Sequence, residues 1–217
     1  MESNADIRNM FKNALILFII TLVSGLVLGF FYELTKDPIR RQQELAIQRA
    51  CRAVFENAAQ FSVVSYTPTE GLKAELAADG VSVGSTYAAL DSEHHHLGYV
   101  VEMTSSEGYG GDITLYLGIT EDGKINGISI LEIAETPGLG MKADEILTPQ
   151  FAHKQAESFT YTKSGSTSAS EIDAISGATV TTKAIVNAVN GGLKVFLQEL
   201  KDMELNIAVS GEGGSSK

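Results

Sequence analysis

One stretch of this sequence combines residue types and spacing that suit chemistry: Asp-Ala-Ile-Ser-Gly-Ala-Thr-Val-Thr, residues 173–181. The pattern is typical of a strand end, a turn of small residues and the first turn of a helix. Counting Thr182, the turn offers four hydroxyl groups and no cation. A helix start presents unpaired backbone N–H groups and the positive end of the helix dipole, which suit a phosphate. The stretch therefore predicts a phosphate site at which a hydroxyl could also hold the phosphate covalently.

A helix must follow this turn to position it. Apolar residues repeat at helical spacing downstream, at Ile185, Val189, Leu193, Phe196, Leu197 and Leu200. They predict a helix over 181–200 that packs one apolar face on a sheet, with Thr181 at its N-terminal end. Gly191 and Gly192 lower the helix propensity of this segment. Another helix is predicted over 144–156, and the serine-rich segment 164–170 is predicted to be a flexible loop.

A β-hairpin is the clearest part of the predicted sheet. Two β-branched runs flank Glu121-Asp122-Gly123-Lys124, in which the Asp-Gly pair is a strong turn signal. The predicted strands are 61–66, 98–104, 113–120 and 125–132. Residues 67–97 show no clear pattern. The predicted fold class is therefore α+β, with one mixed α/β domain built on an antiparallel sheet.

Two glycine-rich segments flank this hairpin. Gly108-Tyr109-Gly110-Gly111 precedes it, and Glu135-Thr136-Pro137-Gly138-Leu139-Gly140 follows it. The first segment lets a backbone bend sharply or approach something flat, with a bulged turn as the plainer alternative. Proline and glycine force a chain reversal in the second. Glu135 has no evident paired acid or histidine, so taken alone it is predicted to be a solvated residue at a strand end.

The N-terminal part predicts a membrane anchor. Residues 14–31 carry no charge and would rise about 27 Å as a helix, close to the thickness of a bilayer core. Pro38 suits the first position of a second helix that leaves the membrane. The predicted organisation is a short tail (1–13), a transmembrane anchor (14–32), a stalk helix (33–60), the mixed domain (61–207) and a disordered tail (208–217).

Composition narrows the classes of function. The chain has 16 Lys and Arg against 27 Asp and Glu, which argues against nucleic acid as a partner. A single cysteine, Cys51, cannot build a disulfide framework or an iron–sulfur cluster within this chain, and we expect it to be partly buried. The adjacent His94, His95 and His96 cannot all converge on one metal ion, so we expect a solvated loop there.

The 173–181 stretch resembles the flavinylation motif of the FMN-binding domain family. That motif reads Asp, two residues, Ser or Thr, Gly, Ala, Ser or Thr, one residue, then an acceptor Ser or Thr. Its fixed positions are filled by Asp173, Ser176, Gly177, Ala178, Thr179 and Thr181. The resemblance implies that the Thr181 hydroxyl carries FMN through a phosphoester.

With the two glycine-rich segments and the N-terminal span, the chain resembles the G subunit of the Rnf electron-transport complex. The C subunit of the sodium-pumping NADH:quinone reductase is the alternative relative. The resemblance implies that the segment after the hairpin lies near the flavin, through Glu135, Thr136, Leu139 and Gly140. It also implies an electron carrier, not a complete enzyme, within a complex that moves electrons from ferredoxin to NAD while pumping sodium ions or protons.

The implied partners are other membrane subunits of that complex, membrane lipid, and a flavin transferase that uses FAD as donor. The implied location is the cell (inner) membrane, crossed once, with the N-terminus cytoplasmic and the flavin domain on the outer face. The positive-inside rule alone leans slightly toward the opposite orientation. Two other readings remain open from the residues: a cofactor-free membrane-tethered binding domain, and a serine hydrolase using Ser176 or Thr179, for which the Gly-x-Ser-x-Gly elbow is missing.

Overall fold

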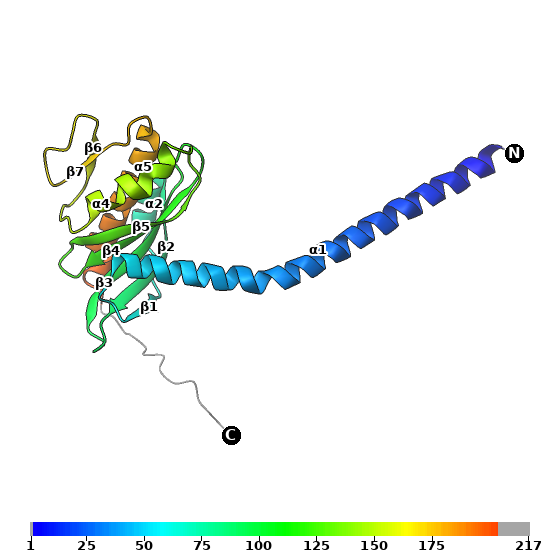
Figure 1. Cartoon of the computed structure of the whole chain (residues 1–217). Coiled ribbons are helices and arrows are strands. Elements are labelled where there is room, and N and C mark those ends of the chain that lie inside the picture. The colour runs from blue at the N-terminus through cyan, green and yellow to red at the C-terminus, as the bar shows by residue number, and fades with distance from the viewer. Residues whose placement is uncertain (1, 204–217) are drawn as a thin grey trace, which may run out of the picture. The chain divides into compact units, whose positions relative to one another are not determined.

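The computed structural model describes residues 2–203, with side chains from Arg8 to Met203. The predicted disordered tail, 208–217, and the last residues of the predicted domain, 204–207, lie outside the described residues. The chain divides into two compact units, residues 1–46 and 47–217. The second unit contains the sheet and confirms the predicted α+β class (Figure 1).

The first unit is one continuous helix. Helix α1 (Glu2–Val54) contains every described residue of it and ends within the second unit. Within α1, the part from Arg8 to Val54 is long and apolar enough to cross a membrane. None of the most apolar 18 consecutive residues in this part is buried inside the protein. The prediction that a second helix begins at Pro38 is wrong, because Pro38 lies inside α1. A proline removes only one backbone hydrogen bond, and the helix continues on both sides of it.

The predicted stalk helix also ends earlier than residue 60. Helix α1 stops at Val54, and the following residues form a turn in which the Ala58 N–H donates to the Phe55 carbonyl at 3.2 Å. The Ala59 N–H donates to the Leu90 carbonyl at 2.8 Å. The chain has therefore begun to pair with β2 before residue 60. A backbone N–H that donates to a neighbouring strand cannot also make the hydrogen bond of a helix.

The main sheet has five antiparallel strands in sequence order, β1-β2-β3-β4-β5. They are β1 (Gln60–Val64), β2 (Val81–Leu90), β3 (His96–Ser105), β4 (Ile113–Thr120) and β5 (Ile125–Ile133). The predicted hairpin is confirmed as β4 and β5. The segment without a predicted structure contains β2 and helix α2 (Glu70–Ala78). A register shift between Val83 and Thr86 interrupts the alternation of β2, which hides it from a period-two pattern.

The two faces of this sheet are covered differently. On one face, Leu115, Leu117 and Ile119 of β4 join a core with α2 and with helix α5 (Thr179–Val195). On the other face, Tyr116 packs with Cys51 and Val54 from the end of α1. Glycines open this second face, because a Cβ on Gly118 would lie 2.9 Å from the Cβ of Val54.

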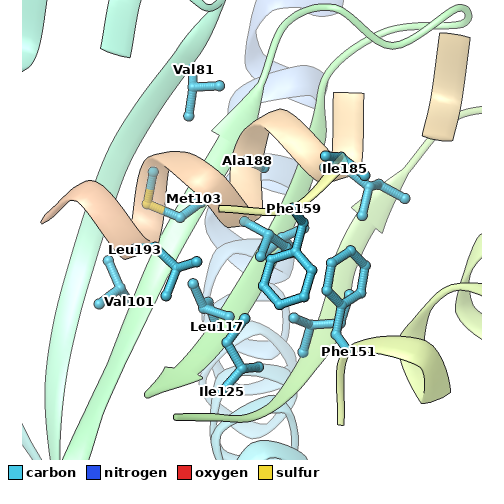
Figure 2. Packing of buried hydrophobic residues seen from close by; sticks show 14 of the residues in the cluster. Val81, Val101, Met103, Leu117, Ile125, Phe151, Phe159, Ile185, Ala188 and Leu193 are labelled. Carbon is cyan, nitrogen blue, oxygen red and sulfur yellow. The ribbon is translucent and has the colours of Figure 1, made fainter. Parts of the chain in front are cut away.

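Helix α5 lies close against the sheet, and its glycines explain how. Figure 2 shows Leu193 of α5 among Val101, Met103 and Leu117 of the strands. A Cβ on Gly192 would lie 2.5 Å from Leu117 Cδ2, and one on Gly191 would lie 3.0 Å from Val81 Cγ1. The residues that weaken the helix by propensity therefore allow its close approach to the strands. After α5 the chain makes one π-helical segment, Phe196–Leu200.

A single helix over 144–156 is not formed. The structure has three short pieces instead: a 3₁₀ turn (Gly140–Lys142), α3 (Ala143–Ile146) and α4 (Thr148–Phe151). Pro149 lies in the first turn of α4, where the missing proline N–H does no harm, so it starts a new helix. Two short parallel strands follow, β6 (Thr160–Thr162) and β7 (Glu171–Asp173), with the predicted loop between them.

The histidine cluster and the cysteine have different outcomes. His94 and His95 are exposed as expected, but the solvated-loop expectation is wrong for His96, which belongs to β3. The Nδ1 of His96 lies 2.8 Å from Glu121 Oε1, and its ring packs on that of Tyr99. Cys51 is buried, as expected, and burial raises the pKa of its thiol to about 12, with a further contribution from the Glu102 carboxylate.

Candidate functional site

A pocket of about 500 Å³ opens at the N-terminal end of α5, and we call it the α5 pocket. Three separate segments of the second unit line it: the glycine-rich loop before β4, the segment after β5 and the first turn of α5. The lining residues are Tyr109, Glu135, Thr136, Leu139, Gly140, Gly177, Ala178, Thr179, Val180 and Thr181. The volume is in the range of pockets that hold small molecules and cofactors.

The first turn of α5 leaves backbone donors without intrahelical partners. Ala178 is the N-cap residue, and it makes no side-chain capping hydrogen bond. The first intrahelical bond runs from the Thr182 N–H to the Ala178 carbonyl at 3.0 Å. By helix geometry, the N–H groups of Thr179, Val180 and Thr181 precede that bond and have no carbonyl one turn back. All three residues line the pocket, so its floor combines these donors with the positive end of the helix dipole.

Thr181 and Thr182 use their hydroxyls differently. The Thr182 hydroxyl accepts the Ile175 N–H at 3.1 Å and donates to the Ala178 carbonyl at 3.0 Å, so it closes the turn from inside. Thr182 is not part of the pocket lining, whereas Thr181 is. Thr181 is only 1% exposed to solvent, so a ligand can reach it only from the pocket that it lines.

Gly140 brings Thr181 and Glu135 together. A Cβ placed on Gly140 would lie 2.7 Å from Thr181 Oγ1 and 2.8 Å from Glu135 Oε2. Any side chain here would collide with both groups, so only glycine fits. The Thr181 hydroxyl and the Glu135 carboxylate therefore both lie beside Gly140 in the pocket lining.

Glu135 is a buried residue, and the prediction that it is solvated is wrong. It is 7% exposed, and its Oε1 accepts the backbone N–H of Tyr109 at 2.7 Å and that of Gly110 at 3.4 Å. These donors come from the glycine-rich loop, which lies far from Glu135 in the sequence. The carboxylate thus fastens that loop to the segment after β5.

The glycines of this loop permit a very close approach between backbones. A Cβ on Gly110 would lie 2.0 Å from the Ala134 carbonyl oxygen, and one on Gly108 would lie 2.1 Å from that of Gly111. The loop bends sharply between β3 and β4, and its approach to something flat stays a prediction. These close approaches place Tyr109 in the lining of the pocket.

Eight of the ten residues predicted for the site line the α5 pocket, and Asp173 and Ser176 do not. The Asp173 carboxylate accepts the N–H of Ser166, and its backbone N–H donates to Gln150 Oε1 at 2.7 Å. Ser176 is exposed on the turn. These two residues therefore shape the approach to the helix: Asp173 orders the preceding loop, and Gly177, with φ of +79°, makes the reversal that a side chain would disfavour.

Two lining residues were not among the predicted site residues, namely Tyr109 and Val180. Tyr109 belongs to the glycine-rich motif, and a large aromatic residue between glycines is the sequence feature that could have indicated a binding role. Val180 is the variable position of the 173–181 stretch. Its position in the first helical turn, between Thr179 and Thr181, is the feature that could have placed it in the site.

Comparisons with known proteins agree with this geometry. Residues 108–194, which include every residue lining the α5 pocket, match the family described as FMN-binding domain. Residues 1–54, which include all of α1, match the family described as RnfG N-terminal region. The matched N-terminal region distinguishes this chain from a protein that shares only the flavin domain.

Individual relatives match along nearly the whole chain. The G subunit of the Na⁺-translocating ferredoxin:NAD⁺ oxidoreductase complex of Acetobacterium woodii is 32% identical over 193 residues, 88% of this chain and 93% of the relative. The proton-translocating counterpart from Clostridium ljungdahlii is 31% identical over 190 residues, 87% of this chain and 92% of the relative. A crystal structure of Shewanella oneidensis NqrC is similar over 52% of this chain and 57% of its own, with 23% identity and a TM-score of 0.44. From the identity and coverage of its relatives, the chain belongs to the RnfG family, the G subunits of Rnf ion-translocating electron-transport complexes.

Proposed function

We propose that this protein is the membrane-anchored flavoprotein subunit of an ion-translocating ferredoxin:NAD oxidoreductase, and that it holds FMN covalently through the hydroxyl of Thr181. The observation that carries the proposal is the position of Thr181, in the first turn of α5 and on the wall of a pocket of about 500 Å³. The relatives named above support the type of complex, and the family match over 108–194 supports the type of cofactor.

The residues of the α5 pocket fit the two chemically different ends of FMN. The first turn of α5 suits the phosphate, because the N–H groups of Thr179, Val180 and Thr181 and the helix dipole all favour negative charge there. Leu139 and Tyr109 offer apolar surface at the mouth, which suits a flat ring system. Gly140 keeps the space beside Thr181 Oγ1 open, since a Cβ there would fill it.

When bound, FMN supplies the redox chemistry through its isoalloxazine ring. The chain's own residues hold and orient that group. Thr181 would hold one end, the N–H groups of the first turn would donate hydrogen bonds to the phosphate, and the loop tied down by Glu135 would form another part of the wall. The buried Glu135 side chain lies beside Gly140 and accepts the backbone N–H of Tyr109. The arrangement serves an electron carrier, in which neither a nucleophile nor a general base has to act on a substrate.

Residues 14–32 are proposed to cross the cell membrane once, with the N-terminus in the cytoplasm and the flavin domain on the outer face. The apolar, unburied stretch of α1 supports a membrane span, and the match of residues 1–54 supports an anchor of the Rnf type. The other membrane subunits of the complex and membrane lipid are the proposed partners. A flavin transferase is the proposed maturation enzyme, and the pumped ion is sodium or a proton.

The experiment is a mass measurement on the full chain co-expressed with a flavin transferase. The wild-type mass is expected to exceed the sequence mass by one FMN less water, and the denatured protein is expected to remain yellow. Thr181→Val is expected to abolish the increment. Thr160→Val is the matched control, because Thr160 is exposed and does not line the pocket, and it is expected to keep the increment. Thr179→Val tests the other threonine hydroxyl of the turn as the acceptor.

Two results would contradict the proposal. A wild-type chain without the FMN increment, made beside an active transferase, would favour a cofactor-free membrane-tethered domain. An increment that survives in Thr181→Val and disappears in Thr179→Val would move the linkage to Thr179. Orientation is tested separately, by attaching a membrane-impermeant label to a cysteine introduced on the flavin domain of intact cells.

A further inference from the structure

Tyr109 stands out because its backbone is tied down while its large aromatic side chain is left uncovered. It is 75% exposed, and among the described residues of the second unit no large hydrophobic side chain is more exposed. Its backbone is fixed by the 2.7 Å hydrogen bond to Glu135 Oε1 and by the tight glycines on either side. Because this backbone is tied down beside the α5 pocket, the uncovered ring is available to pack on a ligand that occupies the pocket.

The residues around Tyr109 indicate what kind of ligand would pack on its ring. Two more half-exposed apolar side chains line the same pocket, Leu139 at 41% and Val180 at 48% exposure. The first turn of α5, which is the proposed phosphate site, lines the same pocket, so a ligand anchored at Thr181 would share it with these three residues. A flat conjugated ring offers the face on which a tyrosine ring packs well.

We propose that Tyr109 lies against the isoalloxazine ring of the FMN held at Thr181 and shields one side of that ring from water. This inference rests on the proposed function, because it needs a flavin attached at Thr181. It makes Tyr109 a positioning residue that also sets how much of the ring reaches solvent. A neighbouring protein of the complex that covers Tyr109 is the competing explanation, and in that case the side chain would leave the flavin of the isolated protein unaffected.

The test compares flavinylated full-length wild type with Tyr109→Phe, Tyr109→Ala and Tyr161→Ala. Tyr161 is the matched control, because it is also an exposed tyrosine, at 37%, and it does not line the pocket. Two quantities are measured on each protein: the fluorescence yield of the flavin and its quenching by iodide. A tyrosine in contact with an excited flavin donates an electron to it, and the electron then returns, so contact lowers the fluorescence. Phenylalanine can cover the ring, but it does not donate in this way.

Tyr109→Ala is expected to raise both the fluorescence and the iodide quenching several-fold. Tyr109→Phe is expected to raise the fluorescence and keep the protection from iodide. Tyr161→Ala is expected to match wild type in both. Equal fluorescence and equal iodide quenching in wild type and Tyr109→Ala would overturn the inference and leave the proposed function intact. If Tyr109→Ala does not fold or take FMN, unchanged fluorescence in Tyr109→Phe overturns it instead. A wild-type chain without the FMN mass increment would overturn both proposals.

Discussion

The Oε1 of Glu135 accepts the backbone N–H of Tyr109 at 2.7 Å, although 26 positions separate the two residues in the chain. This bond joins the loop before β4 to the segment after β5 at the wall of the α5 pocket. Both segments are short and rich in glycine, so neither has a side-chain core of its own. The pocket therefore owes its shape to one buried carboxylate and to backbone approaches that only glycine permits.

Replacing Glu135 tests this role. Glu135→Ala removes the acceptor for the Tyr109 and Gly110 N–H groups, and we expect it to lower the free energy of unfolding by about 1–3 kcal/mol. Glu135→Gln keeps an acceptor oxygen in place and is expected to lose less than half as much. Denaturant unfolding measures both. Equal stability of wild type and Glu135→Ala would show that the bond does not hold the loop.

Gly110 tests the close approach of the two backbones. A Cβ at this position would lie 2.0 Å from the Ala134 carbonyl oxygen, so Gly110→Ala is expected to destabilise the fold by about 1–3 kcal/mol. Gly71→Ala is the control, because Gly71 lies in α2 with nothing within 4 Å of a new Cβ. That change is expected to stabilise the protein by about 0.5–1 kcal/mol. Thermal melting of the two variants should therefore shift in opposite directions.

Substitutions of Thr182 and Thr181 are expected to have different effects, the first on the stability of the fold and the second on cofactor attachment. Thr182→Val leaves the buried Ile175 N–H without its acceptor, and we expect it to lower stability by about 1–3 kcal/mol. Thr181→Val changes a pocket wall and is expected to lose the FMN increment with a smaller effect on stability. Unfolding curves and intact masses of the two variants give the comparison. The reverse pattern would mean that Thr181 closes the turn and Thr182 faces the ligand.

Stability at acidic pH should depend on Glu199. Burial alone would raise the pKa of this carboxyl, but hydrogen bonds from the Thr69 hydroxyl, the Tyr66 hydroxyl and the Thr69 N–H outweigh it and lower the pKa. A folded-state pKa below the unfolded value gives stability that is present above the unfolded pKa and lost as pH falls through the folded pKa. Glu199 thereby ties the segment after α5 to the start of α2.

The measurement is the free energy of unfolding of wild type and Glu199→Gln as a function of pH. Wild type is expected to be the more stable at neutral pH, and the difference is expected to shrink as the solution becomes acidic. Glu157→Gln, at an exposed carboxylate, serves as the control for the change of charge. A difference that stays constant down to the acidic limit would mean that the ionised carboxylate contributes nothing to this contact.

Local patterns in the sequence were sufficient for much of the fold. The apolar N-terminal stretch, the β4–β5 hairpin and the amphipathic α5 follow from periodicity and turn chemistry, which depend on neighbouring residues alone. The resemblance carried by residues 173–181 also led to the right family. Boundaries were less accurate, as at Val54 and Pro149, because tertiary hydrogen bonds and short helices decided them.

The interior of the site depended on contacts between distant segments. The sequence by itself determined which hydroxyls, glycines and carboxylates were available near Thr181, and that a helix begins there. Only the tertiary structure decided that Glu135 is buried, that Thr182 faces inward, that Asp173 and Ser176 stand outside the pocket and that Tyr109 stands at its mouth. The physical reason is that periodicity gives a residue its face on one element, whereas burial and hydrogen bonding depend on which other element packs against that face.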